Sequence, residues 1–330
     1  MIFRQLFDSI SSTYTYIISS GTGREALIID PVLEKTDQYI QLLTQLDLKL
    51  VKVIDTHIHA DHISGLAELR DRTKCITIMG EQAPADVVSM HVKDNENISI
   101  ENIKIKALYT PGHTDDSYSF LMNDRVFTGD TLLIKGTGRT DFQNGNSYDQ
   151  YHSIFNRLLK LPEETFIYPA HDYKGENVST IGEEKRFNPR LQVSSSQEYA
   201  SIMENLNLSN PKMMDIAVPA NKKMGLGIKK QKKLNGITFE KLLSLSIKEN
   251  SILIDLREPI EIERKASIKN SINIPYSDLQ SYLKKNNNSL KSKNIIFYCA
   301  IGERSSLAVQ TSQSYHLNQI YHLIGGINNI

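Results

Sequence analysis

The stretch "THIHADHISG", residues 56–65, carries side chains suited to metal chemistry. His57 and His59 are two positions apart, so both rings can leave the same face of an extended segment. Asp61 and His62 lie in the turn before the helical pattern "SGLAELRD". These residues leave three alternatives open: two zinc ions for hydrolysis, one iron for oxygen chemistry, or no metal.

Three further residues with ligand chemistry lie in turns that contain glycine or proline: His113 in "TPGHTDDS", Asp130 in "FTGDTLL" and His171 in "YPAHDY". Each follows an apolar or β-branched segment, so we expect each to be presented where a strand ends. A single histidine would carry little weight. Histidines and aspartates gathered in several such turns favour a metal site.

The thiol of Cys299 is the second candidate for chemistry. It ends the apolar segment "NIIFYCA" and precedes the loop "AIGERSS". Successive N–H groups of such a loop, together with the N-terminus of the helix after it, favour a thiolate and then a persulfide anion. Arg304 is expected to neutralise a sulfur oxyanion beside the thiol. The other cysteine, Cys75 in "KCITIM", fits a small buried hydrophobic residue.

Two α/β patterns must position these residues. In the first, "STYTYIIS" and "EALIIDP" predict a hairpin, and a run of later strands from "ISIE" to "RVFTGDTLLI" predicts a mixed sheet with helices packed outside. After "VPANKKMGLGIKKQKKLN", strands and helices alternate as in a small parallel sheet. We therefore expect a first domain over residues 1–220, a flexible Lys- and Gly-rich linker over 221–235 and a second domain over 236–330.

Length and charge narrow the classes of function. A chain of 330 residues exceeds what one core usually serves. Lys plus Arg and Asp plus Glu are both 38, so no overall field attracts nucleic acid or an anionic membrane. Few cysteines, no signal-peptide pattern and no long apolar run favour a reducing, cytoplasmic setting. We expect small-molecule substrates, no nucleic-acid or membrane partner, and leave a homodimer open.

The HxHxDH pattern of residues 57–62 resembles that of the metallo-β-lactamase superfamily. The resemblance implies a four-layer αββα sandwich with the metal site along one edge of the two sheets. Within that superfamily, four stretches look like the persulfide dioxygenases: "FRQLFDSISSTYTY", "GTGRTDFQNG", "YPAHDYKGENVSTIGEEKRFNPRL" and "ENLNLSNPKMMDIAVPAN". They are spread over the whole first domain, so the resemblance is specific.

The persulfide dioxygenase resemblance implies one Fe(II) per chain, held by His57, His113 and Asp130. Such a site leaves positions open for a sulfur ligand and O2. The remaining four candidates then orient ligands or substrate, or hold a second metal: His59, Asp61, His62 and His171. All the ligands of a two-zinc hydroxyacylglutathione hydrolase are also present, so that activity stays open as an alternative.

Three residues are candidates for binding the substrate, whose sulfur glutathione would carry. Arg139 has a guanidinium fork that fits a carboxylate at two points, with a structural ion pair to Asp141 as the alternative. The resemblance implies that Tyr173 matches a tyrosine that contacts glutathione in related glutathione-using enzymes. Lys185 stands where the dioxygenases often carry arginine, and it can act as a point charge.

The Cys299 loop resembles the CxxGxR active loop of single-domain rhodaneses, sulfurtransferases that carry sulfur as a cysteine persulfide. "ILIDLREPIEI", "SINIPYSDL" and "LIGGI" resemble other stretches of that family. Two features depart from it: residues 266–268 read Ala-Ser-Ile where Gly-His-Ile is usual, and the sequence stops soon after the Gly-Gly turn. The resemblance implies a small α/β domain with a parallel sheet.

Together the two resemblances imply one shared sulfur chemistry. We expect glutathione persulfide, O2 and water to give glutathione and sulfite at the iron. We expect thiosulfate to pass its sulfane sulfur through a Cys299 persulfide to glutathione. A hydrolase fused to a sulfurtransferase would share no such intermediate. The alternative outside catalysis is a sulfur-carrier or sulfur-sensing module that delivers persulfide to a partner.

Overall fold

The computed structural model describes residues 1–84, 88–224, 228–247, 250–317 and 319–330, which form two compact units. The first comprises Met1–Pro84 and His91–Lys223, and Met224–Ile330 forms most of the second. The change of unit therefore falls inside the segment for which the sequence predicts a linker.

No helix among the described residues is long and apolar enough to cross a membrane.

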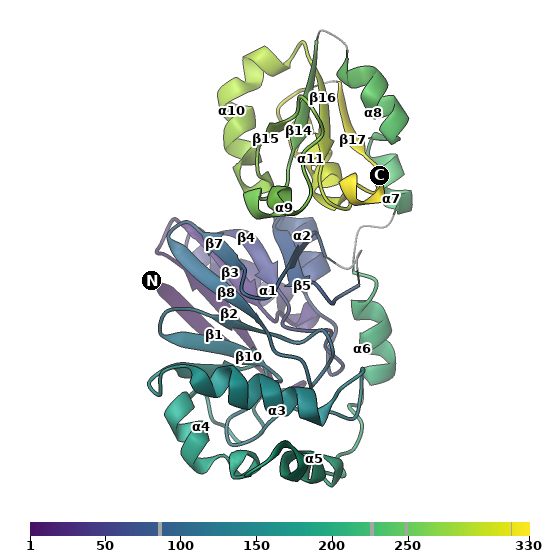
Figure 1. The fold of residues 1–330 in the computed structure, drawn as a ribbon. Helices are drawn as coiled ribbons and strands as arrows, with labels where there is room; N and C mark the ends of the chain where they lie inside the picture. Colours follow the sequence, from purple (N-terminus) through teal and green to yellow (C-terminus); the bar gives the residue numbers. More distant parts are fainter. Residues whose placement is uncertain (85–87, 225–227, 248–249, 318) are drawn as a thin grey trace. The chain divides into compact units, whose positions relative to one another are not determined.

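Two six-stranded sheets form the centre of the first unit (Figure 1). One has the order β1 to β6, with the bounds Ile2–Asp8, Thr13–Ser19, Glu25–Ile29, Lys49–Ile54, Ile76–Gly80 and Met90–Val92. The other contains β7 to β12, which also neighbour one another in sequence order. Their bounds are Asn97–Ile100, Ile103–Tyr109, Tyr118–Leu121, Arg125–Gly129, Phe166–Pro169 and Ser179–Thr180. Both sheets are mixed, and the antiparallel pairing of β2 with β3 confirms the predicted hairpin.

Aromatic side chains join the two sheets face to face. Strand β2 is buried along its whole length, as its run of tyrosine, threonine and isoleucine favours. Tyr16 of β2 packs on Phe127 of β10 with ring centroids 4.9 Å apart, and Phe3 of β1 lies 6.2 Å from Phe127. Such pairs add to the stabilisation from burial alone.

Helices cover the outer faces of the two sheets. Helix α2 (Leu66–Thr73), which follows α1 (Thr36–Gln45), packs on β4 and β5. Helices α3 (Ser147–Asn156), α4 (Ile181–Phe187) and α5 (Ser196–Glu204) pack on the second sheet around Val126, Ile154, Ile167, Ile181 and Tyr199. The expected αββα sandwich is confirmed, and α6 (Met214–Asn221) follows it. Short 3-10 turns lie at Leu33–Lys35, Leu158–Lys160 and Pro189–Leu191.

The second unit has a five-stranded sheet in the order β13-β17-β16-β14-β15. The bounds from β13 to β17 are Gly236–Ile237, Ser251–Asp255, Ile272–Asn273, Asn294–Tyr298 and Ile320–Leu323, and every pair is parallel. Its helices are α8 to α11, at Phe239–Ser246, Pro259–Arg264, Leu279–Leu290 and Glu303–Gln313, with 3-10 turns at Tyr276–Asp278 and Ile327–Asn329. The predicted small parallel sheet is confirmed.

The joining segment differs from its sequence prediction. Helix α6 ends at Asn221, and α7 spans Ile228–Lys233, so part of the expected flexible linker is helical. Lysine and glutamine are good helix formers. Gln231 is also buried, at 3% exposure, and composition alone does not reveal that packing.

Candidate functional site

Loops at the ends of four strands present the predicted metal ligands. His57 follows β4, His113 follows β8, Asp130 follows β10 and His171 follows β11. The turn before His113 requires glycine, because Gly112 has a φ of +136° and a Cβ there would collide with the backbone of Gln150. The prediction that strand ends present these residues agrees with the structure.

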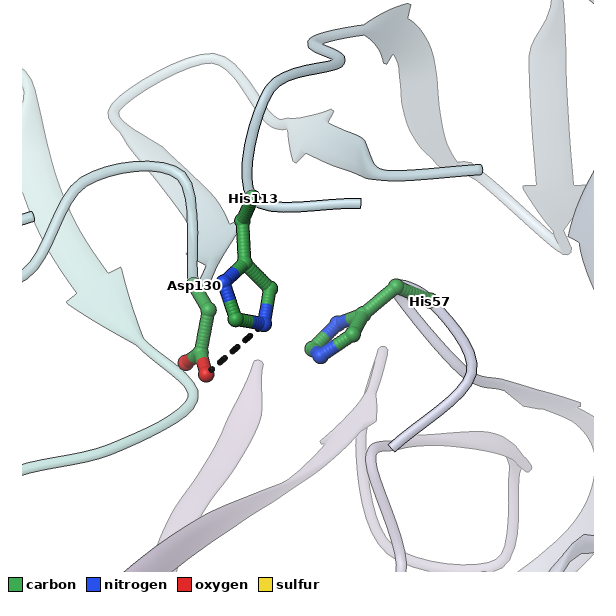
Figure 2. A group of neighbouring side chains, drawn as sticks. All are labelled: His57, His113 and Asp130. Atoms are coloured by element: carbon green, nitrogen blue, oxygen red, sulfur yellow. Dashed lines mark ion pairs between the residues drawn. The ribbon is translucent and has the colours of Figure 1, made fainter. Parts of the chain in front are cut away.

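His57, His113 and Asp130 converge on one point (Figure 2). One ligand atom from each lies within 4.8 Å of the others. Nε2 of His113 is 3.5 Å from Oδ2 of Asp130, and the rings of His57 and His113 have centroids 4.9 Å apart. Two histidines and one carboxylate are the ligand set of non-haem Fe(II) oxygenases, so the donors fit a metal ion of that kind.

Hydrogen bonds fix which ring nitrogens face this point. Nδ1 of His113 lies 2.7 Å from the carbonyl oxygen of Arg139. A carbonyl oxygen only accepts, so Nδ1 carries the hydrogen and Nε2 keeps its lone pair for a ligand bond. Nδ1 of His57 lies 2.9 Å from Oγ1 of Thr56, which leaves its Nε2 for the same purpose.

The charges of His57 and Asp130 suit a ligand set. Burial holds the pKa of His57 well below its usual value, and the neighbouring imidazoles of His59 and His113 lower it further. His57 is therefore the neutral imidazole that a metal needs. Burial alone would raise the pKa of Asp130, but the charge and hydrogen bond of His171 outweigh it and hold that pKa below its usual range. Asp130 is an anion at neutral pH.

His171 bridges two carboxylates. Its Nδ1 lies 2.6 Å from Oδ1 of Asp130 and its Nε2 lies 2.8 Å from Oδ2 of Asp61. Burial would lower the pKa of His171, but the two carboxylates raise it well above the usual value. Both nitrogens of His171 therefore donate, which orients Asp130 toward His113.

A second group of ligand atoms lies beside the first. His59, Asp61 and His62 also bring one ligand atom each within 4.8 Å of the others. Within the described residues, Nε2 of His62 and Nδ1 of His59 are buried without a hydrogen-bond partner. Nε2 of His59 instead faces Oδ1 of Asp30 at 3.2 Å, and although burial would lower its pKa, Asp30 raises that pKa to about 9. His59 is thus held as a cation, unlike His57.

A cavity of about 760 Å³ opens beside the ligands. His113, Asp130 and His171 line it, together with Arg139 and Tyr173. Sequence reasoning missed four further cations on its wall: Lys135, Lys174, Arg190 and Lys212. These four residues are far apart in the sequence, and folding brings them to one cavity wall.

Two of the residues predicted to bind substrate line this cavity: the Tyr173 side chain is exposed, and the Arg139 side chain is held in an ion pair. Tyr173 is 70% exposed, and its ring lies parallel to that of His171 with centroids 6.0 Å apart. Arg139 binds Asp141 at two points, with Nε–Oδ1 and Nη2–Oδ2 distances of 2.6 Å. Its Nη1 also donates to the carbonyl oxygen of Ser209 at 2.6 Å. The ion pair between Arg139 and Asp141, which the sequence leaves open as the alternative role of Arg139, is therefore formed.

Lys185 lies away from the cavity. It is on α4, where its Nζ is 3.7 Å from Oε1 of Glu163, and it does not belong to the cavity lining. A resemblance of local sequence cannot show which face of a short helix carries a side chain.

Cys299 directly follows β16 and is fully buried. The N–H of Gly302 donates to its Sγ at 3.2 Å, and Oγ of Ser305 lies 3.6 Å from Sγ. Gly302 has a φ of +87°, which favours glycine. One N–H of the predicted cradle therefore reaches the thiol, and the thiol itself donates to Oγ of Ser305. Arg304 is also buried, but its guanidinium is bound to Glu261.

Comparisons with known proteins agree with both units. The metallo-beta-lactamase superfamily matches residues 10–83 and 80–171, and the rhodanese-like domain matches residues 238–330. The human protein named persulfide dioxygenase ETHE1, mitochondrial, is 42% identical over 229 residues, which cover 68% of this chain and 89% of that protein. A probable hydroxyacylglutathione hydrolase of Schizosaccharomyces pombe is 31% identical over 237 residues, which cover 61% and 90%.

Two solved structures are similar. A metallo-beta-lactamase from Staphylococcus aureus covers 98% of both chains with a TM-score of 0.62, and at 23% identity it supports the fold alone. The crystal structure of ETHE1 from Myxococcus xanthus is 51% identical, covers 68% of this chain and 100% of that one, and has a TM-score of 0.67. This chain therefore belongs to the ETHE1 persulfide dioxygenase family of the metallo-β-lactamase superfamily, and it carries a rhodanese-like domain over residues 238–330.

Proposed function

We propose that the first unit oxidises glutathione persulfide with O2 at one Fe(II) held by His57, His113 and Asp130. Glutathione persulfide, O2 and water would give glutathione, sulfite and two protons. The observation that carries this proposal is the convergence of two histidines and one carboxylate. That ligand set occurs here in a chain 42% identical to a persulfide dioxygenase.

An iron bound there would supply open positions for the persulfide sulfur and for O2. The protein would supply the rest of the site. Nε2 of His57 and Nε2 of His113 would be the imidazole donors, and Asp130 the anionic one. His171 keeps its protons on the bonds to Asp130 and Asp61, so it holds Asp130 in place without offering a lone pair.

The adjoining cavity suits a glutathione carrier. Its volume of about 760 Å³ lies within the range of small-molecule sites. Glutathione carries two carboxylates, and five cationic side chains line the cavity: Lys135, Arg139, Lys174, Arg190 and Lys212. We propose Arg139 and Tyr173 as substrate contacts, with Arg139 exchanging Asp141 for a substrate carboxylate. Lys185 is left out because it does not line the cavity.

We propose that the second unit is a sulfurtransferase. The Cys299 thiolate would attack the sulfane sulfur of thiosulfate, form a cysteine persulfide and release sulfite. Glutathione would then take the terminal sulfur and leave as glutathione persulfide. The N–H of Gly302, which donates to Sγ of Cys299, supports this role. We propose a reducing, cytoplasmic setting, because it would keep the Cys299 thiol available for this reaction.

One experiment tests the oxygenase. The chain is purified without oxygen, its iron and zinc are measured, and O2 uptake is followed with glutathione persulfide. We expect about one iron per chain and uptake that disappears, together with the iron, in Asp130→Ala. Full O2 uptake with zinc as the metal would contradict the proposal.

A second candidate is a two-zinc hydroxyacylglutathione hydrolase. The grouping of His59, Asp61 and His62 favours it, because these side chains bring three ligand atoms together beside the first site, and a zinc ion bound there would displace the extra proton of His59. Hydrolysis of S-lactoylglutathione by the zinc-loaded chain, without O2 uptake, would support this candidate and exclude the first.

A further inference from the structure

The segment that joins the two units has an unexpected role. Helices α6 and α7 lie outside both matched regions, which end at residue 171 and begin again at residue 238. Each nevertheless carries one buried amide side chain, Asn221 at 0% and Gln231 at 3% exposure. Each amide bonds the backbone of one of the two functional loops.

Asn221 bonds the loop that carries the first metal ligands. Its Nδ2 donates to the carbonyl oxygens of His59 and His62 at 2.9 and 3.0 Å, and its Oδ1 accepts from the N–H of Ser64 at 2.9 Å. Both hydrogens of the amide and one lone pair are therefore used on this one loop. The loop between His57 and Ser64 is closed by a residue more than 150 positions later.

Gln231 bonds the loop that carries Cys299. Its Nε2 donates to the carbonyl oxygen of Ile301 at 3.2 Å, and its Oε1 accepts from the N–H of Gly325 at 2.9 Å. A Cβ on Gly302 would collide with this side chain, so the approach is close.

The bond to Ile301 has a consequence for the thiol. In a trans peptide the C=O and the N–H point in opposite directions. Because Gln231 holds the C=O of Ile301, the N–H of Gly302 in the same peptide group points to Sγ of Cys299, at 3.2 Å. Gln231 thus orients the donor that would stabilise a thiolate or persulfide anion at Cys299.

We infer that the joining segment is a positioning element for both sites, in which Asn221 holds the metal-ligand loop and Gln231 holds the Cys299 loop. The inference rests on the proposed function for the identity of the two reactions. It adds two positioning residues, which touch neither substrate nor metal. Each acts through the peptide groups of its own loop.

Substitutions of nearly equal shape test Asn221 in the full-length chain. Asn221→Asp keeps the acceptor for Ser64 but removes both donors and turns a carboxylate toward two carbonyl oxygens. We expect the metal-free variant to bind Co²⁺ roughly 10- to 100-fold more weakly than the wild type. Its transfer of sulfur from thiosulfate to cyanide should be unchanged. A side chain that only fills space would leave Co²⁺ binding unaltered in this variant.

Gln231→Glu is the matched test at the other loop, since it removes the donor to Ile301 and keeps the acceptor. We expect the kcat of sulfur transfer to cyanide to fall roughly 10- to 100-fold, because a displaced donor no longer meets the sulfur. Alkylation of Cys299 by iodoacetamide should slow as well, while Co²⁺ binding is unchanged. The control is Asn205→Asp, which removes an exposed bond to the carbonyl oxygen of Ser201 and should change neither readout.

The inference requires that Asn221→Asp weakens only Co²⁺ binding and that Gln231→Glu slows only the reactions of Cys299. If either variant loses Co²⁺ binding and sulfur transfer together, or if neither quantity changes, the inference is overturned. A wild-type chain that binds Co²⁺ but does not oxidise glutathione persulfide would instead contradict the proposed function, and Co²⁺ affinity and Cys299 alkylation would still test the two amides.

Discussion

Arg304 and Glu261 form a two-point ion pair inside the second unit, with Nη1–Oε2 and Nη2–Oε1 distances of 2.7 and 2.6 Å. The Arg304 side chain is fully buried and that of Glu261 is 8% exposed. The sequence predicts that Arg304 neutralises a sulfur oxyanion. In the structure its fork is occupied by Glu261, so the pair is close to neutral, and the hydrogen bond that Sγ of Cys299 accepts comes from the N–H of Gly302.

Glu261→Gln should destabilise the second unit strongly. It leaves the Arg304 guanidinium buried without a counter-charge, and breaking a buried pair in this way costs about 3–5 kcal/mol. Urea unfolding of the full-length chain, followed by circular dichroism, measures the loss. The control is Glu81→Gln, which removes a half-exposed pair with Lys93 and should cost less than about 1 kcal/mol. Equal losses in the two variants would contradict the prediction.

Arg139→Ala should raise the KM for glutathione persulfide and leave the iron content unchanged. A charge-assisted contact of about 1.5–3 kcal/mol corresponds to roughly ten- to hundredfold in KM. Steady-state O2 uptake measures it.

Asp141→Asn separates the two roles of Arg139. It releases the guanidinium fork, so KM should not rise if Arg139 binds the substrate. Equal increases in KM for Arg139→Ala and Asp141→Asn would show that the ion pair acts only by holding the loop.

Sequence patterns predict the elements of this chain better than its long-range side-chain pairs. The strands that precede His57, His113 and Asp130 follow from alternation and turn residues, and the three side chains do converge. The roles of Asn221 and Gln231 could not be predicted, because an amide has no catalytic signature. The lysines and glycines around these two residues are typical of a linker.

The end of the first unit can be tested by truncation. A chain that ends at Lys223 keeps Asn221, and it should bind Co²⁺ as tightly as the full-length chain. A chain that ends at Ala220 lacks the three hydrogen bonds to the metal-ligand loop, and its affinity should be roughly 10- to 100-fold lower. The match to the ETHE1 structure from Myxococcus xanthus covers 68% of this chain and 100% of that one. That match supports folding of the first unit alone. Equal Co²⁺ affinities of the two truncated chains would show that the metal site does not need Asn221.

The last prediction concerns sulfur delivery between the two reactions. Both sites lie on one chain, so glutathione persulfide released at Cys299 would be formed at a raised local concentration near the site proposed to consume it, without a direct channel. We expect the intact chain to consume O2 when it is given thiosulfate and glutathione, and Cys299→Ser not to do so. Serine removes the sulfur carrier but touches no residue of the metal site, so the same variant should oxidise pre-formed glutathione persulfide at the wild-type rate. If Cys299→Ser consumes O2 from thiosulfate as fast as the wild type, the second unit does not supply the first.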